Sequence, residues 1–143
     1  MKRAEEALQT VGLADLMNRT YTQISGGEQQ LVLIARAMAQ NARTIIMDEP
    51  TSALDYGNTA RVLQAVRTLS ESGLCIFQST HNPDQAFLYS DKTLALKDGQ
   101  VEAFGDPKVV ITEKLIKDLY STDAKIVSLF DDEIRVCIPD YFS

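Results

Sequence analysis

The sequence predicts an α/β fold with a parallel sheet, because short apolar strands alternate with amphipathic helices. Residues 44–47 form a short apolar run that indicates a buried strand. Residues 58–72 carry apolar side chains at helical spacing and end at Gly73, and residues 75–79 form a second apolar run. The order strand, helix, strand predicts parallel pairing with a right-handed crossover.

Two helices are expected before the first strand. Residues 2–11 have an apolar face and end at Gly12. Ser25 followed three residues later by Glu28 matches the capping-box pattern, and apolar side chains recur behind it at helical spacing. The segment Ser25–Gly26–Gly27 is therefore expected at a helix N-terminus, where backbone amides and the helix dipole favour an anion.

The pattern changes after the second strand. Asn82 followed by Pro83 predicts the start of a helix, and the residues beyond Asp91 have turn signals typical of β-hairpins. The elements expected there are strands at 92–96 and 101–104 around Asp98–Gly99, a helix at 113–120, and strands at 126–130 and 133–138 around Asp131–Asp132.

Composition limits the class of protein. The 143 residues are 45% hydrophobic and 24% charged, as in an ordinary soluble domain, and the net charge of -6 argues against a broad surface for nucleic acid. Cys75 and Cys137 lie far apart without a C-x-x-C or a histidine cluster, which fits a reducing cytosol better than a disulfide scaffold or a zinc site. No apolar run is long enough to span a bilayer, and residues 1–6 do not open a signal peptide, so membrane association is expected through a partner protein.

The dipeptide Asp48–Glu49 is the strongest candidate for chemistry. Both acids follow a predicted strand, at the carboxyl edge of a parallel sheet, where such sheets bind ligands. One acid can hold a magnesium ion through water while the other orients or deprotonates an attacking water. A solvated acidic turn is the alternative explanation of this dipeptide taken alone.

Two further features are ambiguous by themselves. Ser25–Gly26–Gly27 can approach a phosphate closely through its backbone amides, but it also fits a plain capped turn. His81, the single histidine, follows the second strand, where it can serve either catalysis or a structural hydrogen bond.

Four segments together resemble the motifs of ABC transporter ATPases, in the order and spacing of that family. Residues 24–39 resemble the signature motif and its helix, and residues 44–50 resemble Walker B with its adjoining catalytic glutamate. Residues 51–55 resemble the D-loop, and residues 79–81 resemble the switch-histidine segment. The resemblance covers nearly the whole chain. It implies an incomplete P-loop NTPase (RecA-like) parallel sheet, part of the ABC helical signature subdomain and a small C-terminal β-hairpin.

The resemblance also implies a role for each matching residue in binding ATP and Mg²⁺. Asp48 would support the hydration shell of the metal, and Glu49 would act as general base or water-orienter. His81 would contact the γ-phosphate, and Asp55 would couple the two sites of a dimer. The signature residues would complete the nucleotide site of the opposite protomer; they are Ser25, Gly26 and Gly27, followed by Glu28.

The sequence departs from the family in two ways. Glu28 stands where the signature usually ends in Gln, a change that we expect to be tolerated. More importantly, neither a G-x-x-x-x-G-K-[ST] segment nor the glutamine loop occurs in the 143 residues, and the first of these holds the β- and γ-phosphates. In the family that the chain resembles, the strand of the phosphate-binding loop lies beside the strand that leads to the switch histidine. Without it, the strand at 75–79 would have one unpaired edge. We therefore expect the chain to be unstable or inactive alone and to need a companion segment; its start at Met1 is what a truncated or split reading frame would give.

The resemblance extends to the type of transporter. Residues 33–37, 51–58 and 119–124 look most like importers of the iron-siderophore, haem or cobalamin type, and molybdate-type relatives share the pattern. This implies a second ABC ATPase protomer, transmembrane permease subunits and, indirectly, a substrate-binding protein as partners. It also implies a cytoplasmic location, peripheral on the inner face of the cell membrane.

Three regions are expected along the chain: a helical signature subdomain at 1–42, a Walker B to switch-histidine core at 43–106 and a C-terminal extension at 107–143. Two other functions stay open at this point. One is a non-catalytic remnant of an ABC ATPase. The other is a soluble ABC protein acting on nucleic acid or in translation, against which the acidic charge and the single set of motifs argue.

Overall fold

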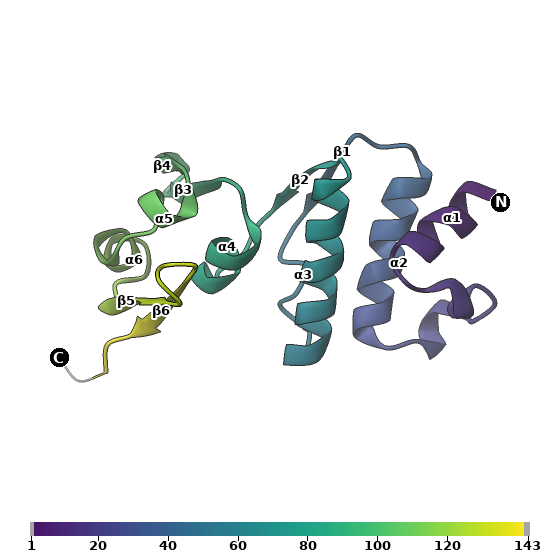
Figure 1. Ribbon diagram of the computed structural model, residues 1–143, viewed down its shortest axis with the longest axis horizontal. Helices are drawn as coiled ribbons and strands as arrows, with labels where there is room; N and C mark the ends of the chain where they lie inside the picture. The colour runs from purple at the N-terminus through teal and green to yellow at the C-terminus, as the bar shows by residue number, and fades with distance from the viewer. Residues whose placement is uncertain (1, 142–143) are drawn as a thin grey trace. The chain divides into compact units, whose positions relative to one another are not determined.

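The computed structural model describes residues 2–141, and the chain divides into two compact units (Figure 1). Unit 1 comprises residues 1–79 and unit 2 comprises residues 80–143. The three regions expected from the sequence, with boundaries at 42/43 and 106/107, stay a prediction.

Unit 1 is built on a cluster of three helices. α1 (Lys2–Thr10) packs on α2 (Gly26–Ala39), and α2 runs beside α3 (Tyr56–Glu71) (Figure 1). Two short 3-10 helices, η1 (Ala14–Leu16) and η2 (Tyr21–Gln23), connect α1 to α2. The three helices share one apolar core, because their apolar side chains recur at helical spacing on the facing sides. Its buried members are Ala7, Val11, Leu13, Leu31, Ile34, Ala35, Val62, Val66 and Leu69.

A two-stranded parallel sheet completes unit 1. β1 (Thr44–Met47) pairs with β2 (Cys75–Gln78) in the register that sets Thr44 opposite Cys75 and Met47 opposite Gln78. Parallel pairing was predicted and is confirmed.

The prediction that both strands are buried is wrong for one face of this sheet. Ile45 is only 6% exposed, whereas its neighbour Ile46 is 81% exposed and the paired Phe77 is 60% exposed. Successive side chains of a strand point to opposite faces. Met47 and Ile76 pack against the helical core, and Ile45, on the same face, is buried, whereas the other face is open within the described residues.

Unit 2 begins with a helix and a hairpin. α4 (Pro83–Tyr89) is capped by Asn82, whose side chain accepts a hydrogen bond from the Asp84 amide, as predicted. β3 (Thr93–Lys97) and β4 (Gln100–Gly105) are antiparallel. Asp98 and Gly99 both have positive φ, 49° and 77°, which is the requirement of a two-residue type I′ turn.

The rest of unit 2 consists of two helices and a second hairpin. α5 (Pro107–Val110) and α6 (Glu113–Tyr120) precede β5 (Ala124–Leu129) and β6 (Ile134–Pro139), which pair antiparallel. The small apolar core of this unit consists of Ala86, Ile111, Ile116 and Ala124, with Phe87, Ile126 and Cys137 packed against it.

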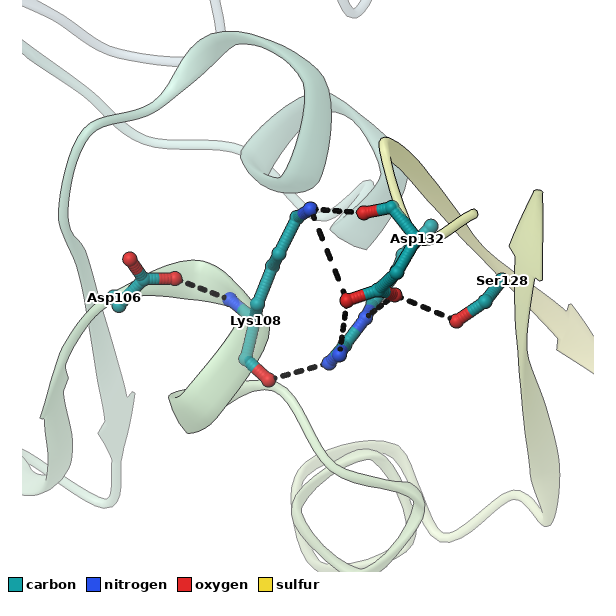
Figure 2. Close-up of polar contacts among 5 residues, drawn as sticks. Asp106, Lys108, Ser128 and Asp132 are labelled. Atoms are coloured by element: carbon teal, nitrogen blue, oxygen red, sulfur yellow. Dashed lines mark hydrogen bonds and ion pairs between the residues drawn. The ribbon is translucent and has the colours of Figure 1, made fainter. Parts of the chain in front are cut away.

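A charged network holds the turn of the second hairpin. Figure 2 shows Lys108 reaching the backbone carbonyl and the carboxylate of Asp132, and the Ser128 hydroxyl donating to the same carboxylate at 2.7 Å. Arg135 donates to both carboxylate oxygens of Asp132, at 2.6 and 2.8 Å, and to the Lys108 carbonyl at 2.6 Å. These hydrogen bonds hold the pKa of Asp132 well below its usual range.

Candidate functional site

Asp48 and Glu49 follow directly on β1 and are joined by one side chain from the end of β2. The Ser79 hydroxyl donates to Oδ1 of Asp48 at 2.6 Å, and the same Oγ accepts a hydrogen bond from the Glu49 amide at 2.9 Å. Ser79 is itself held by the continuing strand pairing, because its amide donates to the Met47 carbonyl at 3.0 Å. Sequence reasoning placed Ser79 in the segment that resembles the switch-histidine motif but did not connect it to the two acids, since these contacts depend on the register of two strands about 30 residues apart.

The backbone of Glu49 has an uncommon conformation. Its φ is +42°, in the left-handed region that non-glycine residues rarely adopt. The carbonyl of Glu49 accepts hydrogen bonds from the amide and the hydroxyl of Ser52, at 3.2 and 3.1 Å. Hydrogen bonds on both sides of the residue therefore offset the conformational cost, which is about 1–3 kcal/mol for such a backbone.

The turn that follows these acids leads into α3. Thr51 is only 7% exposed, and the Leu54 amide donates to its carbonyl at 3.1 Å. Asp55 caps α3: its carboxylate accepts from the amide of Asn58 at 2.9 Å and from the side-chain amide of Asn58 at 2.7 Å. The backbone hydrogen bond from Asn58 is the main reason why the pKa of Asp55 is lowered.

Ser25 and Glu28 form the predicted capping box at the start of α2. The Glu28 carboxylate accepts from the amide of Ser25 at 2.7 Å and from its hydroxyl at 2.8 Å, and the Ser25 Oγ accepts from the Glu28 amide at 3.3 Å. The hydrogen bond from the Ser25 amide lowers the pKa of Glu28. Because the hydroxyl proton of Ser25 is donated to Glu28, the helix start is capped by its own side chains in this structure.

The glycines after Ser25 allow the start of α2 to lie against the turn before α3. Gly27 is buried, and a Cβ added to it would lie 2.5 Å from Cγ and 2.8 Å from Cβ of Asn58. A Cβ on Gly26 would lie 3.5 Å from the Leu54 side chain, an ordinary contact. The structure thus brings the segment 25–28 together with the segment 54–58.

His81 lies in unit 2 and is exposed. The residues beside it are ordered by Thr80, whose hydroxyl donates to the Gln85 side chain at 2.9 Å and accepts from the Asn82 amide at 3.1 Å. Its predicted position near the phosphates of a nucleotide, and therefore near Glu49 of unit 1, stays a prediction.

The acids after β1 fit a hydrated magnesium ion in part. Residues 2–141 contain no group of three or more His, Cys, Asp or Glu side chains placed to hold a metal. Magnesium is commonly held by one or two carboxylates together with waters and the phosphates of a nucleotide. Asp48, which is exposed and uses only Oδ1 for Ser79, can therefore serve as such a ligand, directly or through water.

The structure contains no membrane-spanning helix over the part of the chain that it describes, since none of the helices there is both long and apolar enough.

Comparisons with known proteins place these motifs in context. The family model for ABC transporter matches residues 1–52. An uncharacterised ABC transporter ATP-binding protein of Haemophilus influenzae is 44% identical, over 85% of this chain and 46% of that protein. A phosphonates import ATP-binding protein of Stutzerimonas stutzeri is 34% identical, over 96% of this chain and 50% of that protein. A hemin import ATP-binding protein of Rhodococcus jostii is also 34% identical, over 85% of this chain and 42% of that protein.

The fold has close counterparts among solved structures. One, described as an inward-facing metal-chelate type ABC transporter, superposes with a TM-score of 0.88 at 31% identity, over 99% of this chain and 57% of that chain. The fold is therefore that of an ABC ATPase domain, a P-loop NTPase fold, represented here in part, and the predicted fold class is confirmed. Within that class, the sequence and structure comparisons support an ABC transporter ATP-binding domain. The chain spans about half of the length of the curated relatives that it matches.

Proposed function

We propose that this chain supplies the signature, Walker B and switch-histidine segments of an ATPase that drives an ABC importer. The observation that carries the proposal is the pair of acids after β1, Asp48 and Glu49, joined by Ser79 at the end of the neighbouring strand. Support also comes from relatives that are named as import ATP-binding proteins.

The chemistry assigned to these residues is the activation of water for attack on ATP. Bound magnesium would neutralise charge on the phosphates. Asp48 would hold the hydration shell of that ion, and the Glu49 carboxylate would orient the attacking water and accept its proton. His81 would contact the γ-phosphate when the two units are in their working arrangement.

The second part of the proposal concerns a dimer. Ser25, Gly26 and Gly27 would approach the γ-phosphate bound by a partner protomer, and Asp55 would couple the two sites. For Ser25 this requires that its hydroxyl exchange the hydrogen bond to Glu28 for one to phosphate. Glycine has no Cβ, so at the exposed Gly26 such an anion would be able to approach the backbone amides at the start of α2 closely.

The phosphate-binding loop is assigned to a segment outside these 143 residues, because the sequence contains no G-x-x-x-x-G-K-[ST]. Permease subunits would bind the ATPase at the cytoplasmic face of the membrane, and a substrate-binding protein would act through them. Iron-siderophore, haem or cobalamin compounds are the proposed cargo, although the relative that imports phosphonates is as similar to this chain as the one that imports hemin. The cargo is chosen by those other subunits.

Two measurements test the proposal. The first is calorimetric titration of magnesium-ATP into the chain carrying Glu49→Gln, which suppresses turnover. We expect no detectable binding by the chain alone, because the phosphate loop lies elsewhere. Micromolar binding would contradict this division of the site and would require another phosphate cradle within the 143 residues.

The second measurement restores the missing part. The chain is fused behind the portion of the Haemophilus influenzae relative that it does not match, which the family order predicts to hold the phosphate loop. We expect magnesium-dependent ATP hydrolysis that Glu49→Gln lowers by about 10²–10⁴-fold. Glu71→Gln, an exposed neutralisation on α3, is the matched control and should leave the rate unchanged. A well-folded fusion that binds ATP without hydrolysing it would instead favour a non-catalytic remnant.

A further inference from the structure

We infer that Ser79 is a positioning residue for the two acids after β1: its hydroxyl fixes the Asp48 carboxylate and the Glu49 peptide relative to each other. The inference rests on the functions proposed for Asp48 and Glu49 and adds a residue to that site.

The Ser79 hydroxyl has one proton and two lone pairs. A carboxylate can only accept, so the proton is donated to Oδ1 of Asp48, at 2.6 Å. A lone pair then accepts the Glu49 amide proton, at 2.9 Å. The hydroxyl is therefore used in both directions, and its orientation is determined by its two partners.

The oxygen atom that makes both bonds is itself held in place. The amide of Ser79 donates to the Met47 carbonyl at 3.0 Å, and the Cys75 amide donates to the Arg43 carbonyl at 3.0 Å at the other end of the strand pair. Ser79 is thus anchored to the last residue of β1, directly before Asp48. The position of the Ser79 backbone is therefore set by the pairing of the two strands.

The second partner, Glu49, has a backbone that needs such support. With φ at +42° the residue lies in the left-handed region, and Ser52 holds its carbonyl while Ser79 holds its amide. Without the Ser79 hydroxyl, only the carbonyl side of Glu49 would remain fixed by these serines. Its side chain would then start from a less determined backbone, which changes where the carboxylate can place a water.

The functional consequence follows from the role of such outer partners. Residues that orient a metal-binding carboxylate typically contribute about 10–100-fold to metal affinity or activity when they are removed. We therefore expect Ser79→Ala to weaken the proposed metal site by about tenfold or more. Ser79→Thr keeps the hydroxyl at an exposed position and is therefore the matched control.

The test uses the full 143-residue chain and its backbone amide signals. Hydrogen exchange of the Glu49 amide is measured in the wild type, Ser79→Ala and Ser79→Thr, with the Cys75 amide as the reference for the strand pair. We expect fast exchange at Glu49 in Ser79→Ala alone, with Cys75 unchanged in all three. Unchanged exchange at Glu49 in Ser79→Ala would overturn the inference, and so would equal acceleration at Glu49 and Cys75, since that indicates general loss of stability.

A Mn²⁺ titration in the presence of ATP, with the same three Ser79 forms placed in the fusion described above, tests the proposed metal site. Paramagnetic broadening at Asp48 and Glu49 is expected at about tenfold higher Mn²⁺ in Ser79→Ala, with the Ser79→Thr titration close to that of the wild type. Equal titrations in all three proteins would overturn the positioning role. If even the wild type shows no broadening at Asp48, the metal assignment of the proposed function fails, whereas the exchange result still decides whether Ser79 fixes Glu49.

Discussion

Gly27 at the start of α2 and Asn58 at the start of α3 lie so close that a single added methyl group does not fit between them. A Cβ on Gly27 would meet both Cβ and Cγ of Asn58, at 2.8 and 2.5 Å. Asn58 has little freedom to move away, because its amide and side chain both donate to Asp55. This contact joins the segment that resembles the ABC signature to the first turn of α3, which is capped by Asp55, the last residue of the segment that resembles the D-loop.

The first prediction is that Gly27→Ala destabilises unit 1. Overpacking a close contact typically costs about 1–3 kcal/mol, which exceeds the gain of up to about 1 kcal/mol from replacing glycine in a helix. Urea unfolding, followed by the amide signals of residues 26–39, measures the change.

Gly26→Ala is the matched control for this prediction, because its Cβ would make only an ordinary contact with Leu54, at 3.5 Å. The control should be as stable as the wild type or slightly more stable. Adding Asn58→Gly to Gly27→Ala removes the obstructing atoms, so the double variant should show a favourable coupling. Equal stability of the two alanine variants would contradict the packing seen here.

The second prediction concerns Ser25. Ser25→Ala removes the acceptor for the Glu28 amide and one donor to the Glu28 carboxylate. Loss of such a cap costs about 1 kcal/mol, so the urea midpoint for residues 26–39 should fall. Ser25→Thr retains the hydroxyl and should remain close to the wild type. If both variants lose stability equally, a hydroxyl at this position is not what caps α2.

The third prediction is a dependence on pH that arises from Glu28. Hydrogen bonds from Ser25 lower the pKa of the Glu28 carboxyl in the folded state. A carboxyl of this kind stabilises the fold above its ordinary pKa, and the contribution is lost as the pH falls through the lowered folded value. Glu28→Gln keeps the geometry of the box without the titrating group.

The stability of residues 26–39 should therefore fall less between about pH 7 and about pH 3 in Glu28→Gln than in the wild type. Glu6→Gln neutralises one exposed carboxyl of α1 in the same unit and is the control. If the stability of Glu28→Gln falls with pH as much as that of the control, the Glu28 carboxylate is not the source of the pH dependence.

Features of the fold that depend on near neighbours could be predicted from the sequence. The capping box requires only residues three apart, and the turn at Asp98–Gly99 requires only two residues that tolerate positive φ. Parallel pairing of β1 with β2 followed from the order of elements. Burial of both faces did not, because a four-residue apolar run such as 44–47 looks the same whether one or both faces are covered.

The candidate site could be predicted only in part, for the same reason. Asp48 and Glu49 were recognisable as acids after a strand, and family resemblance gave them roles. Their connection through Ser79 depends on the strand register, which sets Met47 opposite Gln78. The contact between Gly27 and Asn58 depends on how α2 packs on α3, and no local pattern contains that information.

The fourth prediction concerns the second hairpin of unit 2. Asp132 accepts from Arg135 and Ser128, and the Arg135 hydrogen bonds are the main cause of its strongly lowered pKa. Since the folded pKa lies below the ordinary value, Asp132 stabilises the hairpin above that ordinary value. The contribution disappears as the pH falls toward the lowered one. Asp132→Asn can keep the positive φ of 70°, because asparagine tolerates the left-handed region, but it loses the charge.

Hydrogen exchange of the amides of residues 124–139, measured as a function of pH, tests this contribution of Asp132 to the stability of the hairpin. In the wild type, protection should decrease as the solution becomes more acidic than the usual range of an aspartate; in Asp132→Asn it should be weaker at neutral pH and nearly independent of pH. Asp131→Asn is a close control, because Asp131 lies in the same turn with a φ of 52° and carries the same charge. If Asp131→Asn and Asp132→Asn behave alike, general charge in the turn is responsible. A difference between them indicates that the pair of hydrogen bonds from Arg135 to the two carboxylate oxygens of Asp132 is responsible.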